Sequence, residues 1–171
     1  MIVLVLGGAR SGKSEVAESL VQDLAPEGPV TVLATAAVDD ADMAARVAIH
    51  RTRRPPKWAT VETGAHLVEA LGSTAGVVLV DALGTWVASA PEMAVDAQGL
   101  CAALIARTGD TVVVSDEVGL GVHPASEAGR RFRDALGVVN RQVAAVADRV
   151  LLVVAGRTLT LDAGPAAAGP A

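Results

Sequence analysis

The stretch Ile2-Val-Leu-Val-Leu-Gly7-Gly-Ala-Arg-Ser-Gly-Lys-Ser14 decides the fold of this chain. Its apolar start predicts a buried strand, and the glycine-rich part has the pattern G-x-x-x-x-G-K-[ST] of a phosphate-binding loop. Such a loop joins a strand to a helix, and its backbone N–H groups, together with the helix dipole, attract phosphate oxygens. We therefore expect Lys13 to reach the β- and γ-phosphates of a nucleotide and the Ser14 hydroxyl to bind Mg²⁺.

Strand patterns and helix patterns alternate along the rest of the chain. Apolar runs predict strands over 2–6, 30–35, 77–81, 111–115 and 150–154, with an edge strand at 158–162. Alanine-rich segments predict helices over 13–24, 39–50, 65–71, 96–106 and 127–147. Because all but the last strand are continuously apolar, they are expected to be buried on both faces of a parallel sheet. The sequence thus predicts an α/β fold with a mostly parallel sheet flanked by helices.

The composition limits the remaining possibilities. A length of 171 residues predicts one domain, here 1–162, followed by an Ala/Gly/Pro tail at 163–171 that we expect to be disordered. A net charge of −5 argues against a nucleic-acid partner. No apolar stretch is long enough for a transmembrane segment and no signal peptide is evident, so a cytoplasmic location is expected. The single cysteine, Cys101, excludes a disulfide framework.

Asp81 is the second candidate for the nucleotide site. It ends the apolar run Val77-Val-Leu-Val-Asp81, and in proteins with a phosphate loop such an aspartate holds Mg²⁺. A carboxylate at a strand end is also common as a simple cap, but beside a phosphate loop the metal role is favoured.

The segment around His50 is the third candidate. Asp42, Arg46 and His50 are spaced to share one face of a helix, and further arginines follow directly. Neighbouring cations would keep the imidazole neutral, so His50 could attack a phosphorus atom while guanidinium groups hold the phosphates. Alternatively, the segment is a solvated basic helix end in which His50 complements the helix dipole. His66 and His123 have no comparable surroundings.

Asp116 and Glu117 follow another predicted strand and leave two interpretations open. They could bind a metal or act as a base for an attacking hydroxyl. Alternatively, they pair with Arg130 or Arg133 of the helix that follows.

Together these segments resemble the bifunctional adenosylcobinamide kinase / adenosylcobinamide-phosphate guanylyltransferase family over residues 2–162. The resemblance rests on residues 7–14, Ala34-Thr35, Asp42-Met43 with Arg46 and His50, Arg54-Pro55, Trp58 with Glu62, residues 81–86, Glu117-Val-Gly119, residues 129–134 leading to Asn140, Ala147-Asp148 and Ala155-Gly156.

The resemblance implies two activities on a corrinoid. The family phosphorylates adenosylcobinamide with a nucleoside triphosphate, then transfers GMP from GTP to adenosylcobinamide phosphate and releases pyrophosphate. It also implies a P-loop NTPase-type α/β fold, a homotrimer, GTP and ATP as substrates, and Mg²⁺ as cofactor.

It further implies roles for individual residues. His50 would be the catalytic residue that carries GMP covalently, and Ser14 and Asp81 would hold the metal. The nucleotide would be bound by Gly7, Gly8, Ala9, Arg10, Ser11, Gly12, Lys13, Ser14, Ala34, Thr35, Ala36, Arg51, Thr52, Arg53, Arg54, Glu62 and Asp81.

The chain departs from the family pattern at three positions. Asp116 stands where an asparagine is expected, Gly84 where a threonine is usual, and Ser89 where an asparagine is expected. Two other functions compete with the bifunctional enzyme. One is a P-loop small-molecule kinase without guanylyl transfer, and the other is a nucleotide-dependent switch, against which the missing N-K-x-D motif counts.

Overall fold

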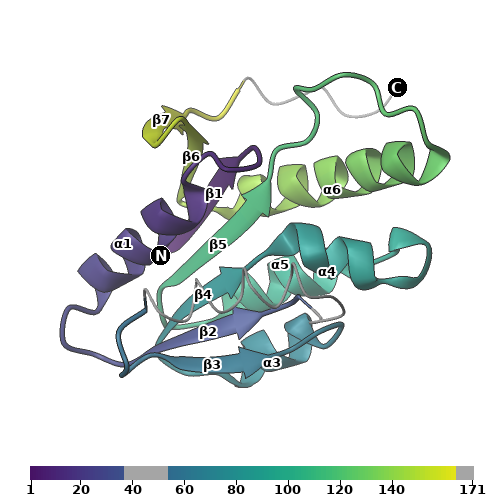
Figure 1. Ribbon diagram of the computed structural model, residues 1–171. Coiled ribbons are helices and arrows are strands. Elements are labelled where there is room, and N and C mark those ends of the chain that lie inside the picture. Colours follow the sequence, from purple (N-terminus) through teal and green to yellow (C-terminus); the bar gives the residue numbers. More distant parts are fainter. Residues whose placement is uncertain (37–53, 165–171) are drawn as a thin grey trace.

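The computed structural model describes residues 1–36 and 54–164, which include a seven-stranded sheet with strand order β3-β2-β4-β5-β1-β6-β7 (Figure 1). All neighbouring strands run parallel except β6 and β7, which are antiparallel. The strands are β1 Ile2–Gly7, β2 Val30–Ala34, β3 Ala59–Glu62, β4 Val77–Asp81, β5 Thr111–Asp116, β6 Arg149–Val154 and β7 Arg157–Leu161. The predicted α/β fold with a mostly parallel sheet is confirmed.

The helices of the described residues cover both faces of this sheet. They are α1 Lys13–Leu24, α3 Leu67–Ser73, α4 Leu83–Ser89, α5 Ala97–Ala106 and α6 Glu127–Val146, with a short 3-10 turn η1 at Pro91–Met93. In Figure 1, α1 lies at the left, apart from α4 and α6 at the right. None of the described helices is long and apolar enough to cross a membrane.

Alternate side chains of β1 build two apolar layers. Val3 and Val5 are fully buried in the layer that includes Ala17 and Val21 of α1. Leu4, also fully buried, belongs to the layer that α3, α4, α5 and α6 form on the opposite face. Because both faces of β1 are covered, the strand is apolar throughout rather than alternating.

The structure agrees with most of the predicted elements. The bounds of α1 and β4 are as predicted, and the other predicted strands shift by at most one residue at an end. The helix predicted over 65–71 lies two residues later. The predicted helix over 39–50 and most of the tail, residues 165–171, lie outside the described residues.

Two elements were not predicted. Strand β3 is exposed along its whole length at the edge of the sheet, so it lacks the apolar run that marks the buried strands. Helix α4 begins two residues after β4 and is only seven residues long, which is too short for a helical periodicity to stand out in the sequence. It places Gly84 beside the carboxyl end of β5, as shown below.

Candidate nucleotide site

The phosphate loop lies between β1 and α1, as predicted, and its glycines are needed for different reasons. Gly12 caps α1 with a left-handed backbone, φ 93°, which side chains other than glycine rarely adopt. A Cβ there would also lie 3.3 Å from Cα of Gly156. At Gly7 a Cβ would lie 2.9 Å from the carbonyl oxygen of Val153, so this position needs room. Gly8 has open space around it.

Neighbouring strands hold the loop in place. The Gly156 N–H, in the turn between β6 and β7, donates to the Ser11 carbonyl oxygen at 2.8 Å. On the other side, the Glu117 N–H after β5 donates to the Gly7 carbonyl oxygen at 3.1 Å. Both donors directly follow strands that pair with β1, so segments on either side of β1 hold the loop.

Lys13 folds back over the loop and carries an ion pair. Its Nζ donates to the Gly8 carbonyl oxygen at 3.2 Å and lies 2.8 Å from Oδ1 of Asp116. The lysine side chain is only 13% exposed, whereas that of Asp116 is 32% exposed. A phosphate-binding role for Lys13 stays a prediction of the motif.

Asp116 therefore pairs with the phosphate loop rather than with the helix that follows it. The alternative of ion pairs to Arg130 or Arg133 is wrong. Arg130 donates to the carbonyl oxygens of Pro124 and Ala125, and Arg133 contacts His123 and Asp134.

Two departures from the family pattern are in contact. The side chain of Asp116 passes so close to Gly84 that a Cβ on this glycine would overlap Oδ2 and lie 3.3 Å from Cγ. Glu117, in contrast, accepts from the Gly119 N–H at 2.6 Å within its own loop.

Arg54 ties Asp81 to α1. Its Nη2 donates to Oδ2 of Asp81 at 2.5 Å, and its Nε donates to Oε1 of Glu18 at 3.2 Å. The Arg54 side chain is 7% exposed, so this bridge lies inside the protein. The sequence marked Arg54 and Asp81 but missed Glu18, because a glutamate on a helix surface carries no distinguishing signal.

The remaining predicted residues lie on the same edge of the sheet. Ala34 is the register partner of both Asp81 and Glu62, so three parallel strands end side by side there. Thr35 is fully buried, and its Oγ1 donates to the Ala82 carbonyl oxygen at 2.6 Å and lies 2.6 Å from Oγ1 of Thr85. Its side chain thus holds the junction of β4 and α4 together.

The other residues of the motif differ in exposure. Ala9 and Arg10 are exposed, Ser11 is buried, and Ser14 is half-buried in the first turn of α1. The four predicted residues His50, Arg51, Thr52 and Arg53 lie outside the described residues, as do Asp42 and Arg46.

The oxygen atoms of Ser14 and Asp81 are of a type that Mg²⁺ accepts as ligands. Within residues 1–36 and 54–164, no group of three or more His, Cys, Asp or Glu side chains could hold a metal ion. Mg²⁺ prefers oxygen ligands and takes one or two from the protein, with phosphate oxygens and waters completing its coordination. A hydroxyl from Ser14 and a carboxylate from Asp81 are ligands of that kind.

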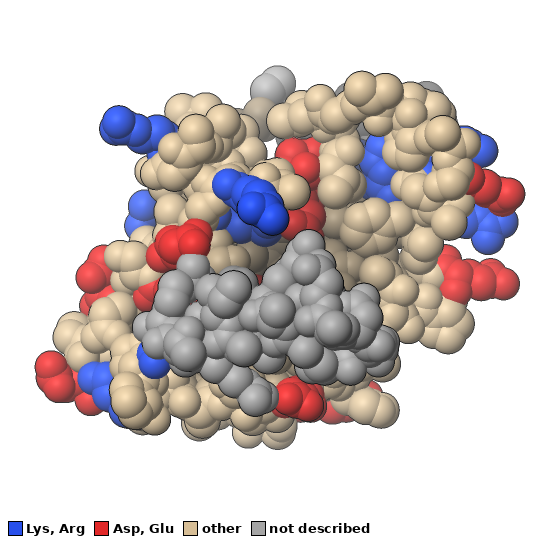
Figure 2. Space-filling model, viewed as in Figure 1, with Lys and Arg blue, Asp and Glu red and all other residues tan. Residues whose placement is uncertain are grey.

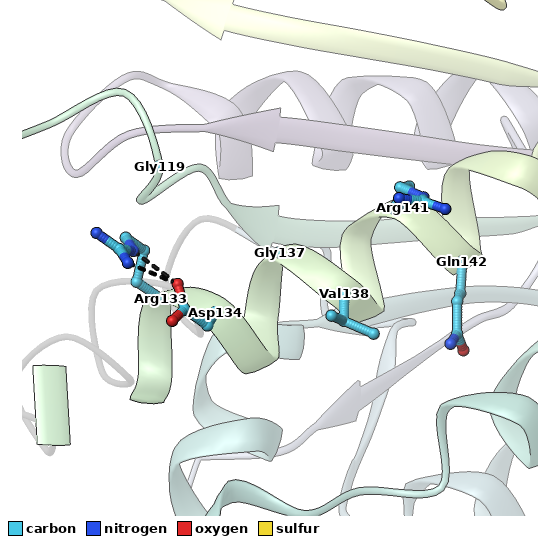
Figure 3. Close-up of a pocket in the computed structure, with 7 residues that line it drawn as sticks. All are labelled: Gly119, Arg133, Asp134, Gly137, Val138, Arg141 and Gln142. Atoms are coloured by element: carbon cyan, nitrogen blue, oxygen red, sulfur yellow. Dashed lines mark hydrogen bonds and ion pairs between the residues drawn. The ribbon is translucent and has the colours of Figure 1, made fainter. Parts of the chain in front are cut away.

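A separate pocket lies between the segment after β5 and helix α6. It has a volume of about 580 Å³ and is lined by Gly119, Arg133, Asp134, Gly137, Val138, Arg141 and Gln142 (Figure 3). Arg133 and Asp134 are paired at its rim, with Nη2 2.7 Å from Oδ1. None of the predicted site residues lines it. On the face seen in Figure 2, acidic and basic side chains are interspersed rather than gathered into patches of one sign.

Comparison with known proteins identifies the family. Residues 3–161 match the family model described as cobinamide kinase / cobinamide phosphate guanyltransferase. The bifunctional adenosylcobalamin biosynthesis protein CobU of Escherichia coli (strain K12) is 40% identical over 178 residues, covering 91% of this chain and 97% of the relative. CobP of Pseudomonas aeruginosa, with the same descriptive name, is 36% identical over 171 residues, covering 95% and 98%.

The match includes every described element that forms the site, from β1 and the phosphate loop to the turn between β6 and β7. The resemblance inferred from the sequence is confirmed, and the chain belongs to the cobinamide kinase / cobinamide phosphate guanyltransferase family.

Proposed function

We propose that this chain catalyses two consecutive reactions of cobalamin biosynthesis. It phosphorylates adenosylcobinamide with a nucleoside triphosphate, and it then transfers GMP from GTP to adenosylcobinamide phosphate, which gives adenosylcobinamide-GDP and pyrophosphate. The observation that carries this proposal is a glycine-rich loop between β1 and α1, in which Nζ of Lys13 donates to the Gly8 carbonyl oxygen, in a chain of this family. The experiment below distinguishes this proposal from the two alternatives, a simple kinase and a nucleotide-dependent switch.

The kinase step requires positioning and charge more than covalent chemistry. The N–H groups of the loop and the first turn of α1 would bind the triphosphate, with Lys13 at its β- and γ-phosphates. Ser14 and Asp81 would hold Mg²⁺, which neutralises the phosphates when it is bound. The acceptor hydroxyl then attacks the γ-phosphorus, the bond to the bridging oxygen breaks, and the nucleoside diphosphate leaves.

The guanylyl step requires a nucleophile, for which we propose His50. A ring nitrogen attacks the α-phosphorus of GTP, a P–N bond forms, and the bond to the β-phosphate breaks with loss of pyrophosphate. An oxygen of adenosylcobinamide phosphate then attacks the same phosphorus and releases the imidazole. Arg51, Thr52 and Arg53 follow His50 directly in the sequence, and Arg54 contacts Asp81, which supports a nucleotide-binding role for this segment.

The test is covalent labelling. Purified protein is incubated with Mg²⁺ and GTP labelled at the α-phosphate, denatured, and assayed for label on the chain. We expect label that is labile in acid and stable in alkali, which identifies a phosphoramidate. It should be absent in His50→Ala and retained in His66→Ala, which removes an exposed histidine in the described part of the chain.

Two other results would overturn parts of this proposal. Phosphoryl transfer to cobinamide without any label on the protein would leave a simple kinase. Nucleotide binding with neither label nor transfer would favour a switch that acts through a protein partner.

We also infer a homotrimer in the cytoplasm, with ATP and GTP as substrates. The apolar side chains of Val154, Leu159 and Leu161 on β6 and β7 are 61%, 59% and 37% exposed, which supports burial against another copy. Sedimentation equilibrium distinguishes a trimer from a monomer directly.

A further inference from the structure

The ion pair between Lys13 and Asp116 occupies the place where nucleotide phosphates are expected. Nζ of Lys13 lies 2.8 Å from Oδ1 of Asp116. The carboxylate is the more accessible partner of the pair, so it borders the open side of the loop. A triphosphate that contacts Lys13 would bring its β- and γ-phosphates next to this carboxylate.

The backbone below Asp116 is held firmly. Asp116 is the register partner of Gly7 in the sheet, and its carbonyl oxygen accepts from Nδ2 of Asn140 at 3.0 Å. Oδ1 of the same asparagine lies 2.5 Å from Oγ of the buried Ser115. The side chain of Asp116 therefore starts from a fixed point beside the phosphate loop.

Gly84 provides the room that the carboxylate occupies. It lies near the start of α4 and is buried. Because its backbone conformation is open to any residue, glycine is needed here for the space that a side chain would fill. A Cβ here would overlap Oδ2 of Asp116 and lie 3.7 Å from its Cβ. Any larger residue at position 84 would force the Asp116 side chain to move.

We propose that Asp116 and Gly84 act as one unit that controls which form of the nucleotide binds. Asp116 is a positioning residue: it holds Lys13 in the nucleotide-free protein and repels triphosphate whose charge is not reduced by a divalent cation. Like charges a few ångströms apart in a partly buried site repel strongly, and a bound cation offsets that repulsion. The site consequently selects the Mg²⁺ complex of the nucleotide over the free anion. This inference rests on the proposed nucleotide-binding function.

The experiment measures the Kd of a fluorescent, non-hydrolysable GTP analogue on the full chain, with Mg²⁺ and with EDTA. In Asp116→Asn, which keeps the shape of the side chain and removes its charge, we expect metal-free analogue to bind about tenfold more tightly. With Mg²⁺ the Kd should change less than about threefold, because the cation already offsets the carboxylate. The ratio of the Kd in EDTA to the Kd with Mg²⁺ therefore falls. Glu127→Gln is the control, since it removes an exposed carboxylate that pairs with Arg131 on α6, and the ratio should stay near the wild-type value.

A double-mutant cycle tests the link to Gly84. Gly84→Ala should lower the same ratio by displacing the carboxylate from Lys13, and it should have no further effect in an Asp116→Ala background. Circular dichroism verifies that the position 84 variants fold, and Asp116→Asn decides the matter if they do not.

The outcomes separate this inference from the function on which it rests. If the wild-type chain binds no nucleotide in either condition, the proposed function fails. If it binds nucleotide and Asp116→Asn leaves the ratio unchanged, or weakens metal-free binding, only the role of Asp116 is overturned.

Discussion

At the scale of single residues, the phosphate loop depends on what surrounds each glycine rather than on glycine content. Gly12 combines a left-handed backbone with a close approach to Gly156, whereas Gly7 lacks only space. Gly8 has neither a positive φ nor a close neighbour within the protein. Its lack of a side chain therefore leaves the backbone accessible to a ligand.

Substitution of Gly12 should destabilise the protein more than substitution of Gly8. We expect Gly12→Ala to lower the free energy of unfolding by about 1–2 kcal/mol, because alanine is strained at positive φ and the added methyl group meets Gly156. Gly8→Ala has open space and serves as the control. Urea denaturation followed by tryptophan fluorescence measures both, and equal losses would contradict this account.

Lys13 should be needed for nucleotide in both reactions. Lys13→Ala removes the cation that contacts the Gly8 carbonyl oxygen, and it leaves Asp116 without its 2.8 Å partner. We expect the Kd for nucleotide to rise at least about tenfold and both transfer rates to fall. Lys57→Ala is the matched control, because this lysine is exposed and lies outside the phosphate loop. Its Nζ is 3.8 Å from Oε2 of Glu27, a residue that follows α1. Unchanged binding in Lys13→Ala would remove the loop from the mechanism.

At the scale of elements, a few polar side chains join helices to strands and loops, in addition to the contacts within the apolar layers. Arg54 joins α1 to β4 through Glu18 and Asp81. Arg107, just after α5, donates to the carbonyl oxygens of Leu71, Thr74 and Gly76, and burial lowers the pKa of its guanidinium. Asn140 joins α6 to β5.

Loss of the Asn140 side chain should uncouple α6 from β5. Asn140→Ala leaves the buried Ser115 hydroxyl and the Asp116 carbonyl oxygen without this partner, so we expect a loss of about 2 kcal/mol in the free energy of unfolding. Arg141→Ala, the next residue on an exposed face of α6, should cost far less. Chemical denaturation compares the two, and similar losses would show that the hydrogen bonds of Asn140 contribute little.

At the scale of the whole molecule, the sheet separates two apolar layers that share its strands. Each layer contains one of the two tryptophans of the chain: Trp58 lies with α1, and Trp86 belongs to α4 on the opposite face. Because β1 contributes alternate residues to both layers, neither layer can lose its packing without disturbing the other.

The two layers should therefore unfold together, as expected for the single domain predicted over 1–162. We expect Trp58→Phe and Trp86→Phe, each with one remaining tryptophan, to show fluorescence transitions that coincide with the circular dichroism transition of the same variant. Each variant serves as the other's control. A fluorescence transition that precedes the loss of helix signal would show that one layer opens separately.

The sequence predicted the parts of this structure that are local and missed those that depend on strand order. The phosphate loop and α1 follow from contiguous residues, and the buried strands follow from their apolar runs. The partner of Asp116 could not be found in the same way, because Lys13 becomes its neighbour only when β5 pairs with β1. Strand β3 lacks an apolar run because it is exposed, and α4 is too short for a helical periodicity to be recognised. The proposed role of His50 stays a prediction.

The contact between Gly156 and Ser11 has a consequence for synthesis of the protein. The phosphate-loop sequence is made before the strands on both sides of β1, which begin only at Thr111, and before the turn that fixes Ser11. A nascent or prematurely terminated chain therefore carries the full motif without the walls that shape it.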